Sequence, residues 1–373
     1  MDGELTANNG GSPVSWQNAL VGSPVEVSGT INISTLVDIS APMDLSGTIN
    51  LSSATVRLSG GPHVIRNGAN VSGTGELRVN TSGSLFLEDG AFVNNHLNNR
   101  GMLQPGTSLA GARIGTAEFG DGYSQSSTAT LGIELADNAA TGDYDILIVE
   151  EDASLAGELQ ITAIDGFVPD IGQVYSVIQA DSVTGTFDEV TFLSESIMKF
   201  DAVVSYPGTR VAVRIVDVYM FGDFNDDTVL DCADVDALVA EIASGAVSLE
   251  FDLNGDSLVN ENDLNLWLAE AGNHNVGGAY LPGDANLDGV VDTSDFNIWN
   301  GSKFTADNGW CGGDFNADAV TDTSDFNIWN SHKFESSDML AVPEPAGLHL
   351  VWVTVLLAAL RRKSHKNGRR QSR

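Results

Sequence analysis

The sequence predicts a mainly β amino-terminal region, followed by small α-helical calcium-loop modules and a hydrophobic carboxy-terminal helix. Three features support this fold class. Residues 13–216 are short runs of alternating apolar residues divided by Gly, Ser, Asn and Asp; an acidic pattern recurs between residues 223 and 325; and residues 346–360 form one apolar run. Alternation with a period of two indicates half-buried strands, and residues 13–216 show no sustained helical spacing.

The strands of residues 13–216 are expected to form a β-solenoid-like domain. The pentapeptide SGTIN starts at residues 28 and 46, and its Ser-Gly-Thr recurs at residue 72, so successive copies start 18 and 26 residues apart. These spacings suit one coil of a β-solenoid, in which stacked coils bury a continuous core. A β-sandwich is the alternative architecture.

The acidic pattern carries the oxygen ligands that a calcium ion needs. It reads Asp-x-Asn-x-Asp-x-x-x-(Asp or Asn)-x-x-Asp and occurs four times. An EF-hand loop binds calcium through side chains at positions 1, 3, 5, 9 and 12 and through the backbone carbonyl of position 7. Acidic turns have a similar composition. Four copies in phase, each followed by a helical pattern, favour calcium loops.

The loops and the helices after them resemble type I dockerin repeats. The predicted helices cover residues 235–243, 264–270, 296–304 and 326–334. Paired units of one loop and one helix, with Asp at position 12, carry the resemblance. It indicates two dockerin-like pairs, at residues 218–273 and 280–336. It implies docking to a cohesin-like or other envelope or matrix protein, with Ca²⁺ as the cofactor.

The resemblance assigns calcium ligands to up to four ions. The four sets are Asp223, Asn225, Asp227, Val229, Asp231 and Asp234; Asp252, Asn254, Asp256, Leu258, Asn260 and Asp263; Asp284, Asn286, Asp288, Val290, Asp292 and Asp295; and Asp314, Asn316, Asp318, Val320, Asp322 and Asp325. Val229, Leu258, Val290 and Val320 would contribute their backbone carbonyls. The second set has only three carboxylates and is expected to bind most weakly. Without metal the carboxylates repel one another, so folding of residues 218–336 is expected to depend on calcium.

Position 6 of such a loop is normally Gly, because its backbone turns sharply there. Only Gly289 meets this requirement; the other loops have Thr228, Ser257 and Ala319. A positive φ at these three residues is expected to be strained, and their loops to bind calcium less tightly.

Loop positions 10 and 11 are the predicted partner-binding residues, because they carry much of the recognition in dockerins. In the third and fourth loops they are Thr293, Ser294, Thr323 and Ser324. The sequence DTSDFNIWN is identical at residues 292–300 and 322–330. The duplication implies a module that binds its partner in either orientation. Phe296 and Trp299 lie on one helical face and are expected in the core, with partner contact as the alternative.

The carboxy-terminal segment, residues 342–373, resembles a PEP-CTERM sorting signal. Pro343-Glu344-Pro345 is followed by the apolar run 346–360 and by seven basic residues. The run is short for a membrane span, and the basic flank follows the positive-inside rule. The resemblance implies export, transient anchoring through helix 346–360, processing by an exosortase-type enzyme, and delivery to the cell surface or outside.

An exported chain is expected to begin with a signal peptide. Residues 1–12 have no basic or apolar stretch of that kind. We therefore expect a disordered tail at residues 1–12 and a true start further upstream. The two cysteines, Cys232 and Cys311, permit one disulfide in such a chain, with two free thiols as the alternative.

Residues 101–161 resemble the later part of autotransporter passenger β-helices. The resemblance rests on Gly101, Pro105-Gly106, Tyr123-Ser124-Gln125, the strand at 131–135, Asp143-Tyr144-Asp145 and Leu155-Ala156-Gly157. It implies a β-helix. Because calcium repeats follow this stretch, self-transport across an outer membrane is not implied.

No catalytic residues are predicted. His63 and His96 stand alone, and five arginines, Arg57, Arg66, Arg78, Arg100 and Arg113, are distributed one per coil. Asp143 and Asp145 are expected on one side of a strand, as turn-flanking residues. The formal net charge of −34 excludes nucleic acid as a partner. The expected function is non-enzymatic: an exported calcium-binding protein that docks through its modules and displays a solenoid or adheres through it. A polysaccharide-degrading enzyme, hydrolase or lyase, carrying dockerin modules is the alternative.

Overall fold

The protein divides into two compact units, residues 1–228 and 229–373. The computed structural model describes residues 25–106, 114–137, 139–140, 142–306 and 308–337, and the backbone of residues 5–7, 14–16 and 19–21. The sorting segment 342–373, with Pro343-Glu344-Pro345 and the apolar run 346–360, lies outside these ranges, as does Arg113. Within the ranges, no helix is both long and apolar enough to cross a membrane.

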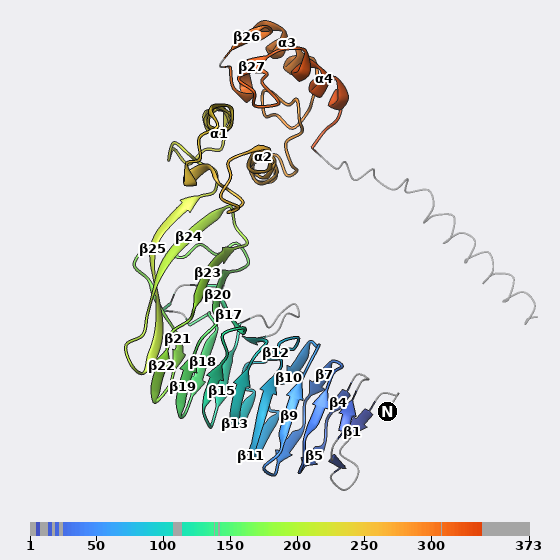
Figure 1. Ribbon diagram of the computed structural model, residues 1–373, viewed down its shortest axis with the longest axis vertical. Helices are drawn as coiled ribbons and strands as arrows, with labels where there is room; N and C mark the ends of the chain where they lie inside the picture. Colours follow the sequence, from blue (N-terminus) through green and yellow to red (C-terminus); the bar gives the residue numbers. More distant parts are fainter. Residues whose placement is uncertain are drawn as a thin grey trace, which may run out of the picture. The chain divides into compact units, whose positions relative to one another are not determined.

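The first unit is mainly β, as predicted, and most of its strands are parallel (Figure 1). One sheet, nine-stranded over the described residues, contains β1 (Leu5–Ala7), β4 (Val25–Val27), β7 (Met43–Leu45), β10 (His63–Ile65), β12 (Ser84–Leu87), β14 (Met102–Pro105), β17 (Thr130–Leu135), β20 (Glu158–Ala163) and β23 (Glu189–Ser194), in this spatial order.

The other sheet of the first unit has 16 strands over the described residues and bends along its length into two rows. The first row is β2 (Val14–Trp16), β5 (Thr30–Ile33), β8 (Thr48–Leu51), β11 (Asn70–Val79), β13 (Phe92–Asn99), β15 (Thr116–Phe119), β18 (Ile146–Val149), β21 (Val174–Gln179), β25 (Arg210–Met220) and β24 (Met198–Ser205). The second row is β3 (Ala19–Val21), β6 (Val37–Ile39), β9 (Thr55–Leu58), β16 (Tyr123–Gln125), β19 (Asp152–Leu155) and β22 (Ser182–Gly185), with β11 and β13 long enough to serve both rows.

The chain visits these rows in turn, and each strand pairs in parallel with the equivalent strand of the previous circuit. The pairing keeps apolar residues in columns: Leu45 pairs with Ile65 and Ile65 with Leu87, and all three are fully buried. Alternate residues of a strand face opposite sides, so one side of every strand enters the shared core. A β-sandwich is built from antiparallel sheets, and the parallel pairing therefore argues against that alternative.

Parallel pairing ends at the last strands of the unit. β25 pairs antiparallel with β21 on one side and with β24 on the other. The strand region thus extends to Met220, four residues beyond the predicted boundary at 216.

The expected disordered tail at residues 1–12 is wrong for Leu5–Ala7. These residues form β1, which pairs in parallel with β4, Leu5 opposite Val25 and Ala7 opposite Val27. The physical reason is that β4 would otherwise leave its backbone N–H and C=O groups unpaired on one edge. The remainder of residues 1–12 lies outside the described residues.

The second unit contains four helices over its described residues. They are α1 (Cys232–Ser244), α2 (Glu261–Asn275), α3 (Thr293–Ser302) and α4 (Thr323–His332), with 3₁₀ turns η1 (Leu249–Phe251) and η2 (Trp310–Gly312) and a short antiparallel pair, β26 (Thr305–Ala306) and β27 (Val320–Thr321). Each helix begins three residues before its predicted start, because loop positions 9 and 12 form a capping box with the first helical turn.

The aromatic residues Phe296, Trp299, Phe326 and Trp329 form the contact between α3 and α4. Their ring centroids lie 5.0–6.4 Å apart. The two indoles make reciprocal hydrogen bonds: Trp299 Nε1 donates to the Asp322 carbonyl at 2.8 Å and Trp329 Nε1 to the Asp292 carbonyl at 2.9 Å. The expectation of core packing is confirmed for Trp299, which is buried, whereas Phe296 is half-buried in the same contact, and the duplicated sequence gives a duplicated contact.

Cys232 and Cys311 form a disulfide, which decides between the two alternatives that the sequence leaves open. It joins the start of α1 to η2. Beside it, the Cys311 N–H donates to Asp236 Oδ1 at 2.9 Å. The bond therefore links the first predicted dockerin-like pair to the second.

Replacing both cysteines with alanine should destabilise the second unit by about 4 kcal/mol, because the disulfide closes a long loop in the unfolded chain. Trp267, Trp299, Trp310 and Trp329 lie in this unit, so tryptophan fluorescence during denaturant unfolding reports on it. Reductant should lower the stability of the natural protein and leave the variant unchanged. Equal stability of the variant and the oxidised natural protein would contradict the prediction.

Candidate calcium sites

The four acidic loops share one backbone conformation. Position 6 has a positive φ in every loop: 66° at Thr228, 67° at Ser257, 84° at Gly289 and 69° at Ala319. The predicted left-handed conformation at these residues is confirmed. Position 4 also has a positive φ in each loop, for example 57° at Leu287. The sequence pattern does not show this second turn, since position 4 carries four different residue types.

These turns direct backbone N–H groups towards the carboxylate at position 1. In the third loop, Asp284 accepts hydrogen bonds from Asp288 N at 3.2 Å and from Gly289 N at 2.9 Å. Asn286 Oδ1 accepts from Asp288 N at 3.1 Å, and Asp288 Oδ1 accepts from Val290 N at 3.0 Å. The second and fourth loops repeat all four bonds. The loops are thus held closed by the side chains that are the predicted ligands.

Positions 9 and 12 connect each loop to its helix. Asp292 caps α3 by accepting from Ser294 N at 2.6 Å, while Asp295 accepts from Asp292 N at 2.7 Å. The other oxygen of Asp295 accepts from Ala285 N at 2.9 Å, at the start of the loop. The four position-12 residues, Asp234, Asp263, Asp295 and Asp325, are fully buried. Position 12 therefore ties the two ends of the loop together.

The position-1 carboxylates of the third and fourth loops are buried next to other carboxylates. Burial, first, and then the negative charges of Asp295 and Asp288 raise the pKa of Asp284 to about 7, against the hydrogen bonds from Gly289 and Asp288 that lower it. Burial likewise raises the pKa of Asp314 to about 6. In the first two loops the position-1 residues, Asp223 and Asp252, are only half-buried.

No ion pair reaches these carboxylates within residues 229–306 and 308–337. The two lysines there, Lys303 and Lys333, donate instead to Asn300 and Asn330, at 2.8 and 2.7 Å. Buried carboxylates without a cationic partner are costly, and a hard divalent cation with oxygen ligands would offset that cost. The donor chemistry fits Ca²⁺.

The side chains of the predicted calcium ligands do not converge on one point. Over the described residues, no three Asp, Glu, His or Cys side chains converge as they would on a bound ion. In the third loop Asn286 Nδ2 donates to Asp288 Oδ2 at 2.9 Å, so two predicted ligands satisfy each other. A bound ion would take the place of this contact. The first loop is divided between the two units, with residues 223–228 in one and 229–234 in the other.

The predicted partner-binding residues are exposed at the start of the last two helices: Thr293, Ser294, Thr323 and Ser324. The sequence pattern did not identify two further exposed residues, Phe304 and Phe334, whose exposed fractions are 70% and 73%. Both follow a lysine and have a positive φ, of 65° and 71°. Large side chains are rarely held in this conformation, and each phenylalanine is kept there by a backbone bond, to Thr321 O and to Val291 O.

Two residues of the first unit that were considered as catalytic candidates, Asp145 and His63, are buried. Asp143 and Asp145 do not share a face, which corrects the expectation: Asp143 is exposed, whereas Asp145 is fully buried. The physical reason is that Asp145 accepts hydrogen bonds from Gly115 N at 2.8 Å and Glu134 N at 2.9 Å. His63 is also buried, and desolvation lowers its pKa.

Comparison of the sequence with protein-family models and with curated proteins yields no match.

Removal of calcium with EGTA should reduce the helical circular dichroism of the second unit and lower its melting temperature, because the loop carboxylates then repel one another. Adding Ca²⁺ should restore both, and Mg²⁺ at equal concentration should restore less. The Asp263→Asn variant should need more calcium than Asp295→Asn, since it leaves two ligand carboxylates in the second loop whereas Asp295→Asn leaves three in the third. A spectrum and melting curve unaffected by EGTA would rule out calcium-dependent folding.

Without metal, the second unit should become less stable as pH rises from 3.8 to about 7. The folded-state pKa values of Asp284 and Asp314 are raised, so the folded state binds more protons than the unfolded state in this window, and their favourable contribution is lost as pH rises. Calcium should reverse the trend, because it binds the ionised carboxylates. Melting curves in EGTA test this, with Asp284→Asn/Asp314→Asn as the control that flattens the profile. Metal-free stability that rises across this window would contradict the argument.

Proposed function

We propose that the protein is an exported, non-enzymatic calcium-binding protein of the cell surface or extracellular space. Its second unit would dock to a partner protein, and its first unit would be a β-solenoid used for display or adhesion. The observation that supports calcium binding is the burial of four carboxylates in the third and fourth loops, with no ion pair to them among the described residues: Asp284, Asp295, Asp314 and Asp325. Such a set requires a cation for stability at neutral pH.

The disulfide supports export. Disulfides form and persist in oxidising compartments and are rare in the cytosol. Cys232 and Cys311 lie beside the first and fourth loops, so the bond and the bound calcium would stabilise the same unit. The sorting segment 342–373 would add transient anchoring through its apolar helix and release by an exosortase-type enzyme.

The docking function is supported by a duplicated exposed surface. Thr293-Ser294 with Lys303-Phe304 forms one copy, and Thr323-Ser324 with Lys333-Phe334 forms the other. Exposed aromatic residues next to polar groups are typical energetic centres of protein interfaces. The reciprocal indole bonds between α3 and α4 make the two copies equivalent, so a cohesin-like partner could bind either.

The solenoid assignment is supported by the parallel, in-register pairing of successive circuits over residues 25–194. Stacked circuits extend a core in one direction and leave long flat faces exposed. Faces of this kind suit display or adhesion.

Replacing both exposed phenylalanines, Phe304→Ser with Phe334→Ser, should abolish calcium-dependent capture of the partner without changing the melting temperature. Each side chain is largely exposed, so its loss should cost the fold little. Either single variant should retain binding, because the other copy remains. The measurement is calcium-dependent pull-down from the native cell, followed by titration of the purified partner. Capture that persists in EGTA, or that survives the double variant, would argue against docking by this surface.

A further inference from the structure

Each of the two exposed phenylalanines of the second unit is attached to the calcium loop of the other copy. Phe304 follows α3, whose own loop is the third, yet its N–H donates to the carbonyl of Thr321 in the fourth loop at 2.6 Å. Phe334 follows α4, whose own loop is the fourth, and its N–H donates to the carbonyl of Val291 in the third loop at 2.6 Å. Thr321 and Val291 both occupy loop position 8. The attachment is therefore crossed and reciprocal.

A short antiparallel ladder surrounds the bond from Phe304. Thr305 pairs with Thr321 and Ala306 with Val320, as β26 and β27. Val320 occupies position 7, so its carbonyl is a predicted calcium ligand. That carbonyl belongs to the same planar peptide unit as the Thr321 N–H. Fixing the Val320 carbonyl therefore also fixes the strand that holds Phe304.

The third loop holds the segment of Phe334 in the same manner. Val291 N donates to the Glu335 carbonyl at 3.0 Å, beside the bond from Phe334 to Val291. Val290 also forms an antiparallel bridge with Ser336. The Val291 N–H belongs to the same peptide unit as the carbonyl of Val290, the predicted ligand at position 7. One planar amide thus connects the calcium site to the segment after α4.

The loops and the phenylalanines both depend on these ladders. Val291 and Thr321 are fully buried, and buried backbone groups require hydrogen-bond partners. The segments that follow the opposite helices provide those partners. Phe304 and Phe334, in contrast, are mostly exposed and have a positive φ, which large side chains rarely adopt. Because burial does not hold these two residues in place, their position depends on the ladder.

We propose that calcium binding in one loop positions the phenylalanine of the other copy: the fourth loop controls Phe304 and the third loop controls Phe334. The inference rests on the proposed calcium binding, and its relevance to docking rests on the proposed docking surface. In an empty loop the carboxylates repel one another, so the peptide unit at positions 7 and 8 is held less firmly and the ladder opens more often. In an occupied loop the position-7 carbonyl is fixed as a ligand.

Each copy of the docking surface then depends on both loops. In one copy, Thr293 and Ser294 lie at the start of α3, beside their own loop, whereas Phe304 is held by the fourth loop. The other copy has the reverse dependence. A defect in one loop therefore weakens both copies, whereas loss of one phenylalanine affects only its own copy. Because coupling between binding sites is reciprocal, a partner bound at Phe304 should in turn tighten calcium binding in the fourth loop.

The test follows hydrogen exchange of the Phe304 and Phe334 amides by NMR, in the full chain, as calcium is added. These two N–H groups make the crossed bonds, so their exchange reports on those bonds directly. Asp318→Asn removes one carboxylate from the fourth loop, and Asp288→Asn removes the equivalent one from the third. With Asp318→Asn, protection of Phe304 should require about tenfold more calcium, while Phe334 keeps its natural calcium dependence. With Asp288→Asn the two amides should exchange roles.

Asp256→Asn, the same change at position 5 of the second loop, is the matched control and should leave both amides unchanged. A phenylalanine that responds to the loop before its own helix would overturn the inference, and so would two amides that respond equally to both variants. Either result leaves calcium binding itself intact. Calorimetry on the same samples separates the two proposals, because a natural protein that binds no calcium would overturn both.

A second pair of variants tests the coupling from the opposite side, with no change to a loop. Phe304→Pro removes the N–H of the crossed bond and cannot adopt a positive φ. It should weaken calcium binding in the fourth loop and leave the third unchanged, and Phe334→Pro should do the reverse. The amide signals of Ala319 and Gly289, at position 6 of the two loops, report on each site during the calcium titration. Equal calcium affinities at both sites in both variants would overturn the crossed control.

Discussion

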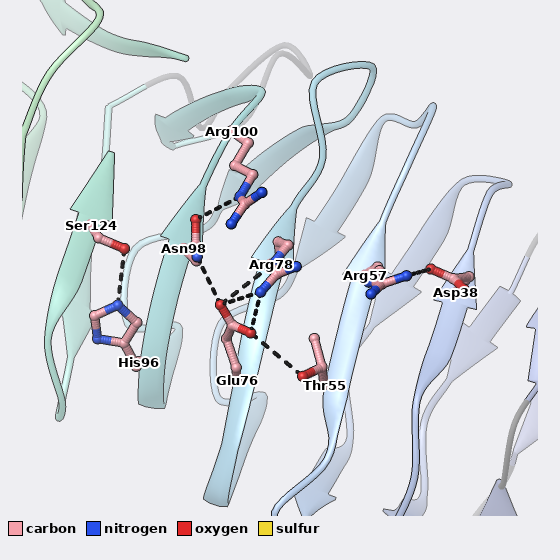
Figure 2. Close-up of polar contacts among 9 residues, drawn as sticks. All are labelled: Asp38, Thr55, Arg57, Glu76, Arg78, His96, Asn98, Arg100 and Ser124. Atoms are coloured by element: carbon pink, nitrogen blue, oxygen red, sulfur yellow. Dashed lines mark hydrogen bonds and ion pairs between the residues drawn. The ribbon is translucent and has the colours of Figure 1, made fainter. Parts of the chain in front are cut away.

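The parallel backbone ladder between successive circuits of the chain is the constraint on which the first unit depends. Each circuit supplies backbone N–H and C=O groups that the next circuit must pair in register. A shift of one residue would turn the apolar column through Leu45, Ile65 and Leu87 to the outside. The ladder therefore fixes the core and, at the same time, the order of side chains on every exposed face. The placement of Arg57 beside Arg78 (Figure 2) is a consequence of this register.

The second unit is organised by a different constraint, the carboxylates of its loops. The same residues serve two purposes: position 9 caps a helix, and position 12 closes the capping box and holds the start of the loop. In the third loop, Asp295 performs the second role while it is fully buried. Among the described residues, no ion pair balances the buried carboxylates of the third and fourth loops, and for this reason we connect the stability of this unit to calcium.

A duplicated sequence in the second unit accounts for the contact between α3 and α4. Identical nine-residue segments at 292–300 and 322–330 pack against each other through the same aromatic residues and the same indole bonds. The apolar side chains are thereby used in the core. The residues that this packing leaves exposed are the hydroxyl pairs at the helix starts and Phe304 and Phe334 after the helix ends, and these are the residues that we propose for recognition.

The sequence alone determined the features that depend on local patterns. Period-two alternation predicted a mainly β first region, and the acidic spacing predicted the four loops, their helices and the positive φ at position 6. It did not determine what depends on contacts distant in the sequence. The parallel pairing, the Cys232–Cys311 bond, the burial of Asp145 and the gathering of Arg57, Arg78 and Arg100 were decided by the tertiary structure. The physical reason is that these contacts join residues far apart along the chain: successive circuits in the first unit, and two cysteines 79 residues apart in the second.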